Sequence, residues 1–124
     1  MRAGSDSELG SAAVEFALVL PVVLLLVMAL VEVAVVARTQ LEVVNAAREG
    51  AREAAASPDP SAAVAAVRAT LGELGPSARV SVRRPDVVGR QATVRVTVPY
   101  RVAGVLLGGF RVQLSATSSM RVER

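Results

Sequence analysis

The hydrophobic pattern divides the chain into an apolar N-terminal stretch, a stretch of helical period and a C-terminal part of alternating polarity. Residues 16–31 carry no charge, and residues 33–37 extend the apolar run past Glu32. At roughly 1.5 Å per residue, a helix of this length spans a hydrocarbon core about 30 Å thick. We therefore expect a transmembrane helix over residues 11–37, bent at Pro21, which removes one backbone hydrogen bond inside the helix.

A cleaved secretory signal is the alternative explanation of this run, because residues 35–37 end in the small residue Ala37. Two features oppose that explanation. The preceding flank carries Asp6 and Glu8 as well as Arg2, and the apolar run is longer than the roughly 7 to 15 residues of a typical signal core. A retained anchor is therefore favoured, although the flanking charges do not fix its orientation.

Residues 38–56 continue the helical pattern as a stalk, until the residues SPDP at positions 57–60 end it. Ala46, Gly50 and Ala54 are spaced by four and form a strip of small side chains that lets another helix approach closely. Packing against the protein's own domain is the simpler use of this strip, and packing against a second protein helix is the alternative. The expected apolar face of the stalk consists of Leu41, Val44, Ala47, Ala51, Ala54 and Ala55.

Residues 57–124 predict a small α+β domain. Ser61 is placed to cap a second helix that runs to about Leu74, where Gly75 and Pro76 end it. Polarity then alternates with period two over three segments, which predicts a three-stranded antiparallel sheet with one buried face. The expected inward positions are Val80, Val82, Val94, Val96, Val98, Val112, Leu114 and Ala116.

An apolar loop over residues 102–110 is expected between the second and third strands. None of its side chains is polar, so its only polar groups are those of the backbone. The loop either folds back over the sheet or contacts a membrane or another subunit, and the sequence leaves both readings open.

The composition excludes most catalytic chemistry. The 124 residues include no Cys and no His, which removes disulfides, thiolate nucleophiles, imidazole bases and the usual zinc and haem ligands. Thr117, Ser118 and Ser119 form a hydroxyl cluster, but no imidazole is present to activate them. We expect no enzyme activity, no catalytic residues, no metal site and no cofactor.

The net charge of +3 is unevenly distributed, because most of the basic residues follow Ala37. Every one of these basic residues is Arg. This excess favours an anionic neighbour such as lipid headgroups or a wall polymer, although solvated surface charge is the simpler explanation. Several arginines share one face of the predicted sheet, yet no aromatic residues alternate with them to stack on bases, so nucleic acid is not an expected partner. These arginines are Arg79, Arg83, Arg95 and Arg111.

A distinctive segment stands immediately before the apolar run, where residues 10–16 read GSAAVEF. A glycine after a short hydrophilic leader offers a peptidase a flexible bond at the membrane face. Cleavage after Gly10 would free an amine on Ser11, four residues from Glu15. In a bundle of copies, the carboxylate could pair with the amine of a neighbour and set the register, or it could simply reach the lipid headgroups.

This segment resembles the processing site of TadE-type pseudopilins, in which Glu15 and Phe16 follow the glycine junction and continue as EFALVLP over residues 15–21. Residues 45–55, NAAREGAREAA, resemble the helix that follows the membrane span in the same family. Residues 114–123, LSATSSMRVE, resemble its C-terminal end. One departure is the sequence EVA over residues 32–34, where such proteins often carry an acidic residue followed by Phe and Gly.

The resemblance implies a cytoplasmic leader over residues 1–10, cleavage by a prepilin peptidase after Gly10 and an extracytoplasmic C-terminal domain. It also implies a minor pilin or pseudopilin of a tight-adherence (Flp, type IVb-like) pilus. The expected partners are the prepilin peptidase, other pilins or pseudopilins, a membrane platform, a secretion ATPase and the lipid bilayer. The alternative function is a membrane-anchored extracytoplasmic interaction domain with no role in a pilus.

Overall fold

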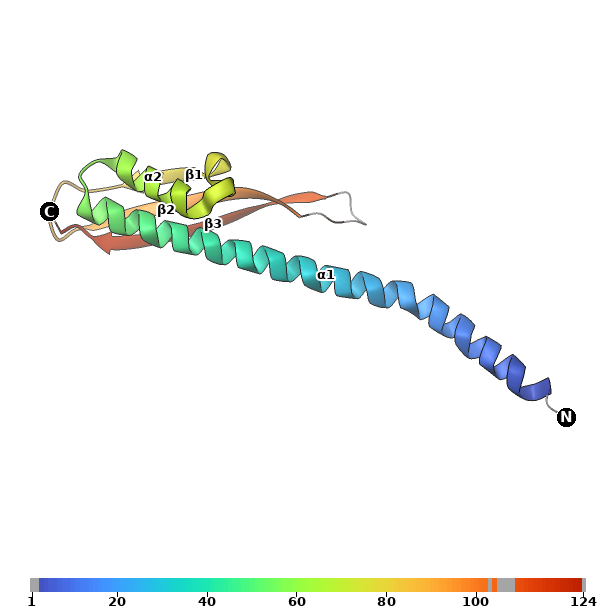
Figure 1. The fold of residues 1–124 in the computed structure, drawn as a ribbon. Helices are drawn as coiled ribbons and strands as arrows, with labels where there is room; N and C mark the ends of the chain where they lie inside the picture. Colours follow the sequence, from blue (N-terminus) through green and yellow to red (C-terminus); the bar gives the residue numbers. More distant parts are fainter. Residues whose placement is uncertain (1–2, 103, 105–108, 124) are drawn as a thin grey trace. The chain divides into compact units, whose positions relative to one another are not determined.

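The computed structural model describes the backbone of residues 3–102, 104 and 109–123, and the side chains of these residues from Gly10 onward. The chain divides into two compact units, Met1–Val35 and Val36–Arg124, and the long helix α1 contributes to both. The elements, labelled in Figure 1, are α1 (Ala3–Ala56), α2 (Pro60–Leu71), the 3-10 helix η1 (Gly72–Ser77), β1 (Arg79–Arg83), β2 (Gln91–Val102) and β3 (Phe110–Arg121).

The described part of the first unit is the N-terminal portion of α1, which is apolar around its whole circumference from Val14 to Val35 apart from Glu15 and Glu32. Pro21 lies inside the helix. Figure 1 shows the helix axis changing direction in this blue portion. A proline that removes one hydrogen bond of the helical ladder is a sufficient cause of such a bend.

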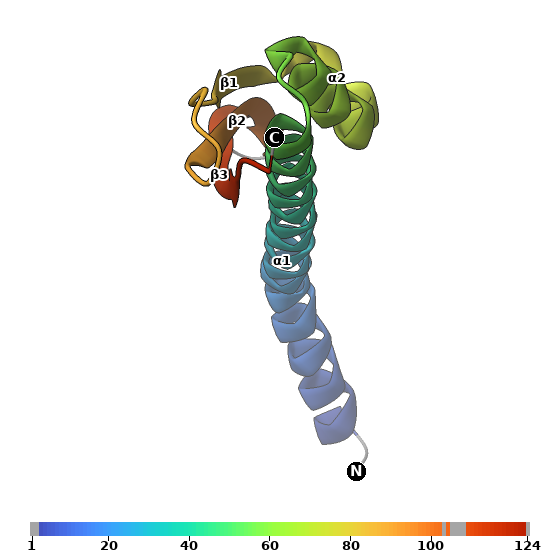
Figure 2. The ribbon, with the colours of Figure 1, turned by 90° about the vertical axis from the view of Figure 1, so that its left-hand side faces the viewer.

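The second unit is built on the C-terminal portion of α1, which lies with α2 against one face of the sheet (Figure 2). Alanine and valine dominate this contact, because small side chains let the helix backbone approach the strands closely. Gln40 on α1 fixes the edge of the sheet by donating from Nε2 to the backbone oxygen of Ser115 on β3 at 2.9 Å. The core residues on α1 are Val43, Ala46, Ala47, Ala51 and Ala54.

The sheet has the order β1-β2-β3, and both pairings are antiparallel. Val96 of β2 lies opposite Val80 of β1 and Ala116 of β3, so the inward side chains form continuous rows across the sheet. Val94, Val96 and Val98 are all fully buried. The predicted α+β fold, with two helices and a three-stranded antiparallel sheet, is therefore confirmed.

The structure corrects the predicted limits of the second helix. Its N-cap is Asp59 and not Ser61, because Pro60 takes the first helical position and the Asp59 carboxylate accepts from the Ser61 backbone N–H at 2.9 Å. The α-helix ends at Leu71 and not near Leu74. Gly72 adopts a φ of 57°, which costs glycine little, and η1 then carries the chain through residues 72–77.

The expected apolar face of the stalk was partly wrong. Leu41 is 64% exposed, whereas Val43 is fully buried. The buried stripe runs through positions 39, 43, 46, 47, 50, 51, 54 and 55, which keeps the helical spacing of three and four but leaves Leu41 outside it.

The predicted apolar loop over residues 102–110 lies largely outside the described residues. Its two ends are described: Val102 is buried at the end of β2, and Phe110 is half exposed at the start of β3. Neither reading of the loop is tested by these two positions.

The C-terminal segment is tied to the end of α1. The backbone N–H of Glu123 donates to the carbonyl of Ala55 at 3.2 Å, and Nε of Arg84 donates to the carbonyl of Ala54 at 2.8 Å. These bonds satisfy carbonyl groups that the last turn of a helix leaves without an intrahelical partner. Val122 is buried beside them, so the end of the chain closes the core.

Candidate functional site

The segment over residues 10–16 lies entirely within α1. A Cβ atom built on Gly10 meets nothing within 4 Å, so packing against the described residues does not require glycine there. Glycine inside a helix costs about 1 kcal/mol relative to alanine. The described fold therefore gives no packing reason for glycine at position 10.

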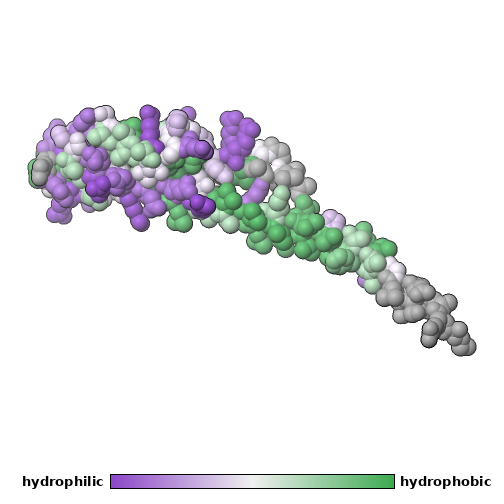
Figure 3. Space-filling model, in the orientation of Figure 1, coloured by the Kyte–Doolittle hydropathy of each residue, from purple (hydrophilic) through white to green (hydrophobic). Residues whose placement is uncertain are grey.

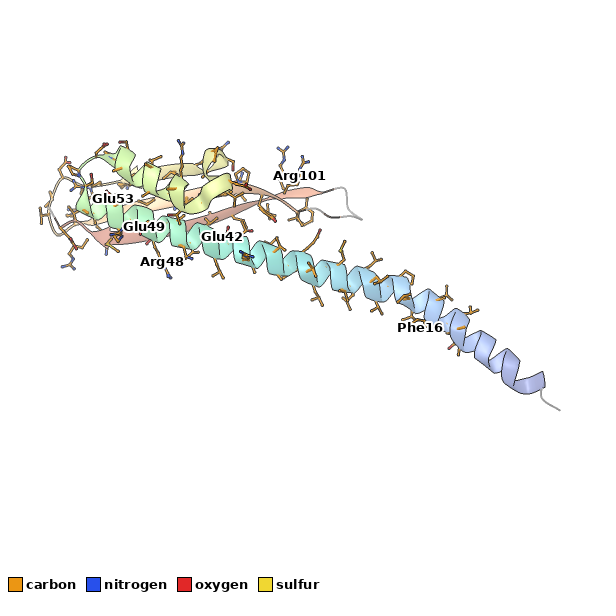
Figure 4. All side chains as sticks on the ribbon, in the orientation of Figure 1. Phe16, Glu42, Arg48, Glu49, Glu53 and Arg101 are labelled. Atoms are coloured by element: carbon orange, nitrogen blue, oxygen red, sulfur yellow. The ribbon has the colours of Figure 1, made fainter. Side chains whose placement is uncertain are left out.

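Ser11 and Glu15 are four residues apart in one helix, so they lie on the same face about one turn apart. Both residues are exposed, and no salt bridge among the described side chains includes Glu15. Phe16, labelled in Figure 4, is 67% exposed. The predicted processing residues and the predicted register residues thus occupy an accessible stretch of helix.

An exposed apolar surface follows this stretch, coloured green in Figure 3. Leu18, Leu24 and Leu30 are examples of large side chains that no described residue covers. In the part of the chain that the structure describes, the Gly10–Ala56 helix is long and apolar enough to cross a membrane by length and composition. A signal sequence near an N-terminus has the same properties, so processing has to be measured to separate the two.

The strip formed by Ala46, Gly50 and Ala54 faces the interior of the second unit. A Cβ atom on Gly50 would lie 2.5 Å from Cγ2 of Val67 on α2 and 3.1 Å from Cγ1 of Val94 on β2. Both distances are too short for an unshifted side chain. In this structure the strip is therefore occupied by elements of the same chain.

The side of the stalk outside this strip carries charged residues that are exposed or half-buried, of which Glu42, Arg48, Glu49 and Glu53 are labelled in Figure 4. Nε of Arg52 donates to Oε2 of Glu49 at 3.1 Å, and this hydrogen bond lowers the pKa of the Glu49 carboxyl. Exposed pairs at helical spacing contribute little to stability. This side of the stalk is a solvated surface.

The described residues contain no group of three or more Asp, Glu, His or Cys side chains that could hold a metal ion. The hydroxyl cluster is divided by the strand alternation, because Thr117 and Ser119 are exposed while Ser118 is half-buried. The three hydroxyls therefore do not converge on one point.

A feature that the sequence did not predict lies on the exposed face of the sheet. Five side chains from three strands surround a hollow with a volume of about 340 Å³: Ser81, Arg83, Thr93, Arg95 and Thr117. The sequence placed Arg83 and Arg95 on one face, but the hollow depends on the register between strands.

The fold and the exposed helix place the chain in a structural class, that of α+β domains preceded by an apolar helix of transmembrane length. The family model described as TadE-like protein matches residues 10–52 and begins at Gly10. The resemblance to TadE-type proteins is thus confirmed over these residues, which include the first two of the three resembling stretches, up to position 52. Searches of curated proteins and of solved structures found no match.

Proposed function

We propose that this chain is a membrane-anchored minor pilin or pseudopilin that takes part in assembly of a tight-adherence type pilus. The observation that carries the proposal is the TadE-like match, which begins at the glycine of the proposed processing site and runs into the stalk. The exposed apolar helix supports it, because such a surface requires lipid or other apolar helices around it.

Processing is the first step of the proposal. A prepilin peptidase cleaves after Gly10 and removes the leader over residues 1–10. An accessible glycine, whose Cβ position is empty of neighbours, leaves room for a peptidase to reach the bond. The mature chain then begins at Ser11, with a new positive charge one helical turn from Glu15.

Localisation follows from the same arrangement. Residues 11–37 span the membrane once, the short N-terminus lies in the cytoplasm, and residues 38–56 lead as a stalk to the extracytoplasmic domain over residues 57–124. The span carries Glu32 near its end, and the insertion cost of one carboxylate there is outweighed by the many Leu and Val residues before it.

Assembly is the second step. Within a bundle of pilin helices, Glu15 pairs with the Ser11 amine of a neighbouring copy, and Phe16 enters the apolar contact. The same-helix pairing of Ser11 and Glu15 is the competing arrangement, because four-residue spacing also brings them together in one chain. A pair between copies sets the register of subunits, whereas a pair within one copy does not.

The partners of the proposed function are the prepilin peptidase, other pilins or pseudopilins, the membrane platform and secretion ATPase of the pilus machine, and the lipid bilayer. The chain acts as a structural component and not as an enzyme. It uses no cofactor, and nucleic acid is not among its partners.

An anchor exchange tests this function against the alternative of an anchored interaction domain. In cells lacking the native gene, residues 1–37 are replaced by an unrelated transmembrane anchor that no prepilin peptidase cleaves, and surface pili are counted by microscopy. We expect the exchanged protein to reach the membrane without restoring pili, while the native chain restores them. Undiminished pili in the cells that lack the gene would support the anchored interaction domain instead, and full restoration by the exchanged protein would show that processing of this chain is not needed.

A further inference from the structure

Among the described residues, helices cover one face of the sheet and leave the other face open. Figure 2 shows α1 and α2 on the same side, and none of the labelled elements lies on the other. The outward positions are the odd-numbered residues of all three strands, because the register pairs Ser81 with Arg95 and Arg95 with Thr117. Nearly all the remaining outward positions are Ser, Thr or Gln, and none is Asp or Glu. Six outward positions are arginines: Arg79, Arg83, Arg95, Arg101, Arg111 and Arg121.

These arginines have no carboxylate partner among the described residues. The two salt bridges there, Arg38 with Glu42 and Arg52 with Glu49, both lie on α1. Arg101 and Arg111 stand directly opposite each other on β2 and β3. Like charges in opposed positions are destabilising. A fold that keeps such a pair without a counter-charge attracts anions to this face.

The hollow on this face offers several hydrogen-bond donors to one anion. Arg95 lies opposite Ser81, and Arg83 lies opposite Thr93, so the two guanidinium groups belong to diagonal positions about 7–8 Å apart at the backbone. Both side chains line the hollow together with three hydroxyl residues. Nε of Arg95 donates a hydrogen bond to Oγ1 of Thr117 at 3.3 Å, which leaves the other N–H groups of the Arg95 guanidinium for a ligand.

A phosphate group suits this set of donors better than a carboxylate does. Guanidinium binds both anions in a bidentate manner, but a phosphate presents its oxygens in a tetrahedral arrangement that two guanidinium groups and the hydroxyls between them can reach from different sides. A carboxylate presents its two oxygens in one plane, whereas the two unesterified and two ester oxygens of a phosphodiester point in four different directions. The lining of the hollow, with two arginines and three hydroxyl residues, therefore favours phosphate.

The spacing of the arginines points to a polymer. Along β2, the successive outward rungs at positions 91, 93, 95 and 97 each carry one arginine, contributed by β3, β1, β2 and β1 respectively. Neighbouring rungs are about 6.6 Å apart along the strand, since a strand rises about 3.3 Å per residue. The arginines themselves are farther apart, because they lie on strands spaced by about 4.8 Å, and their long side chains flank a line along β2. An extended phosphodiester chain with a three-carbon repeat has as many backbone bonds per repeat as two residues of a strand, so its phosphates recur at a similar interval.

We propose that the outward face of the sheet binds an extended polymer of repeating phosphodiester units, with one phosphate seated in the hollow between Arg83 and Arg95. Nucleic acid has the same charge but fits less well, because no outward strand position is aromatic and none can stack on a base. The proposal is independent of the role in pilus assembly.

The test uses the full chain in an uncharged detergent, with poly(glycerol phosphate) as the probe and binding followed by calorimetry at physiological salt. The double variant Arg83→Gln/Arg95→Gln is expected to bind at least tenfold more weakly than the native chain. Arg68→Gln, which removes an exposed arginine from α2, is the matched control and should change affinity less than twofold. Circular dichroism and the thermal midpoint establish that each variant is folded.

Three further ligands separate the chemistry of the probe. Polygalacturonate of matched charge tests carboxylates, glycerophosphoglycerol tests a single phosphodiester such as a lipid headgroup presents, and an oligodeoxynucleotide of matched charge tests nucleic acid. The proposal requires poly(glycerol phosphate) to bind at least tenfold more tightly than each of them. Equal affinity for any one of them, no binding of the polymer, or full binding by the folded double variant would overturn it.

Discussion

At the scale of single residues, two glycines of α1 differ in what surrounds them. Gly10 has open space where a side chain would stand, whereas Gly50 touches Val67 and Val94. Both valines are fully buried, and valine has little freedom to rotate away. Gly50 is thus required by packing, whereas packing against the described residues does not require glycine at position 10.

We expect Gly50→Ala to destabilise the folded domain by about 1–3 kcal/mol, because the added methyl group overpacks a core that has no room for it. Better helix propensity offsets about 1 kcal/mol at most. The thermal midpoint of the full chain in detergent measures the change, with Ala65→Gly at an exposed position inside α2 as a control for propensity. An unchanged or raised midpoint in Gly50→Ala would show that α1 and α2 are less closely packed than the structure has them.

Glu15 is expected to matter for assembly and not for insertion. Glu15→Gln keeps the size and removes the charge, and an unpaired buried partner in the bundle costs roughly 3 kcal/mol or more. In cells lacking the native gene, the variant should reach the membrane and begin at Ser11, but surface pili should be lost.

The matched control for that variant is Glu42→Gln, which removes an exposed carboxylate from the same helix. It should leave piliation unchanged. Normal piliation with Glu15→Gln would reject the pairing between copies and leave Glu15 as a carboxylate at the membrane interface.

Asp59 makes the cap of α2 dependent on pH. The hydroxyl and then the backbone N–H of Ser61 donate to its carboxylate and lower its pKa. Because the folded pKa lies below the unfolded one, this stabilisation is present above the unfolded value and is lost as pH falls through the folded value. Asp59→Asn should therefore flatten the decline of the thermal midpoint between about pH 5 and pH 3, compared with the native chain. Parallel curves for the two proteins would show that the cap contributes no pH dependence.

At the scale of elements, the sequence predicted an element correctly where the same pattern was repeated over many residues. The strands were predicted correctly because valines alternate with polar residues at successive positions of each strand, as in residues 93–98. The sequence did not determine which face of the stalk helix is buried, because Leu41, Val43 and Val44 are all apolar. Only contact with the sheet decides which of them is buried. The helix limits failed for a related reason: Asp59 and Ser61 are both good caps, and the position of Pro60 decides between them.

The site followed the same rule. Its linear part, from Gly10 to Phe16, could be proposed from the sequence because its residues are neighbours in the chain, and its role stays a prediction. The hollow between Arg83 and Arg95 could not, because it depends on which residues of β1, β2 and β3 stand opposite one another.

At the scale of the whole molecule, the two units have different requirements. The second unit, Val36–Arg124, has its own buried core, whereas the apolar side chains of the first unit are exposed. A fragment starting at Arg38 should therefore be soluble without detergent and show helix and strand together by circular dichroism, while the full chain should require detergent. A disordered spectrum from the fragment would contradict an independently folded second unit.

The most direct test of the proposed role is the mass of the N-terminal peptide of protein extracted from membranes of cells that produce the pilus. Cleavage by a prepilin peptidase predicts a chain that begins at Ser11, and Gly10→Val, which places a branched side chain at the scissile bond, should leave the leader attached. A native chain that still begins at Met1, or one that begins at Arg38 after signal cleavage, would contradict the account of an anchored and processed pilin.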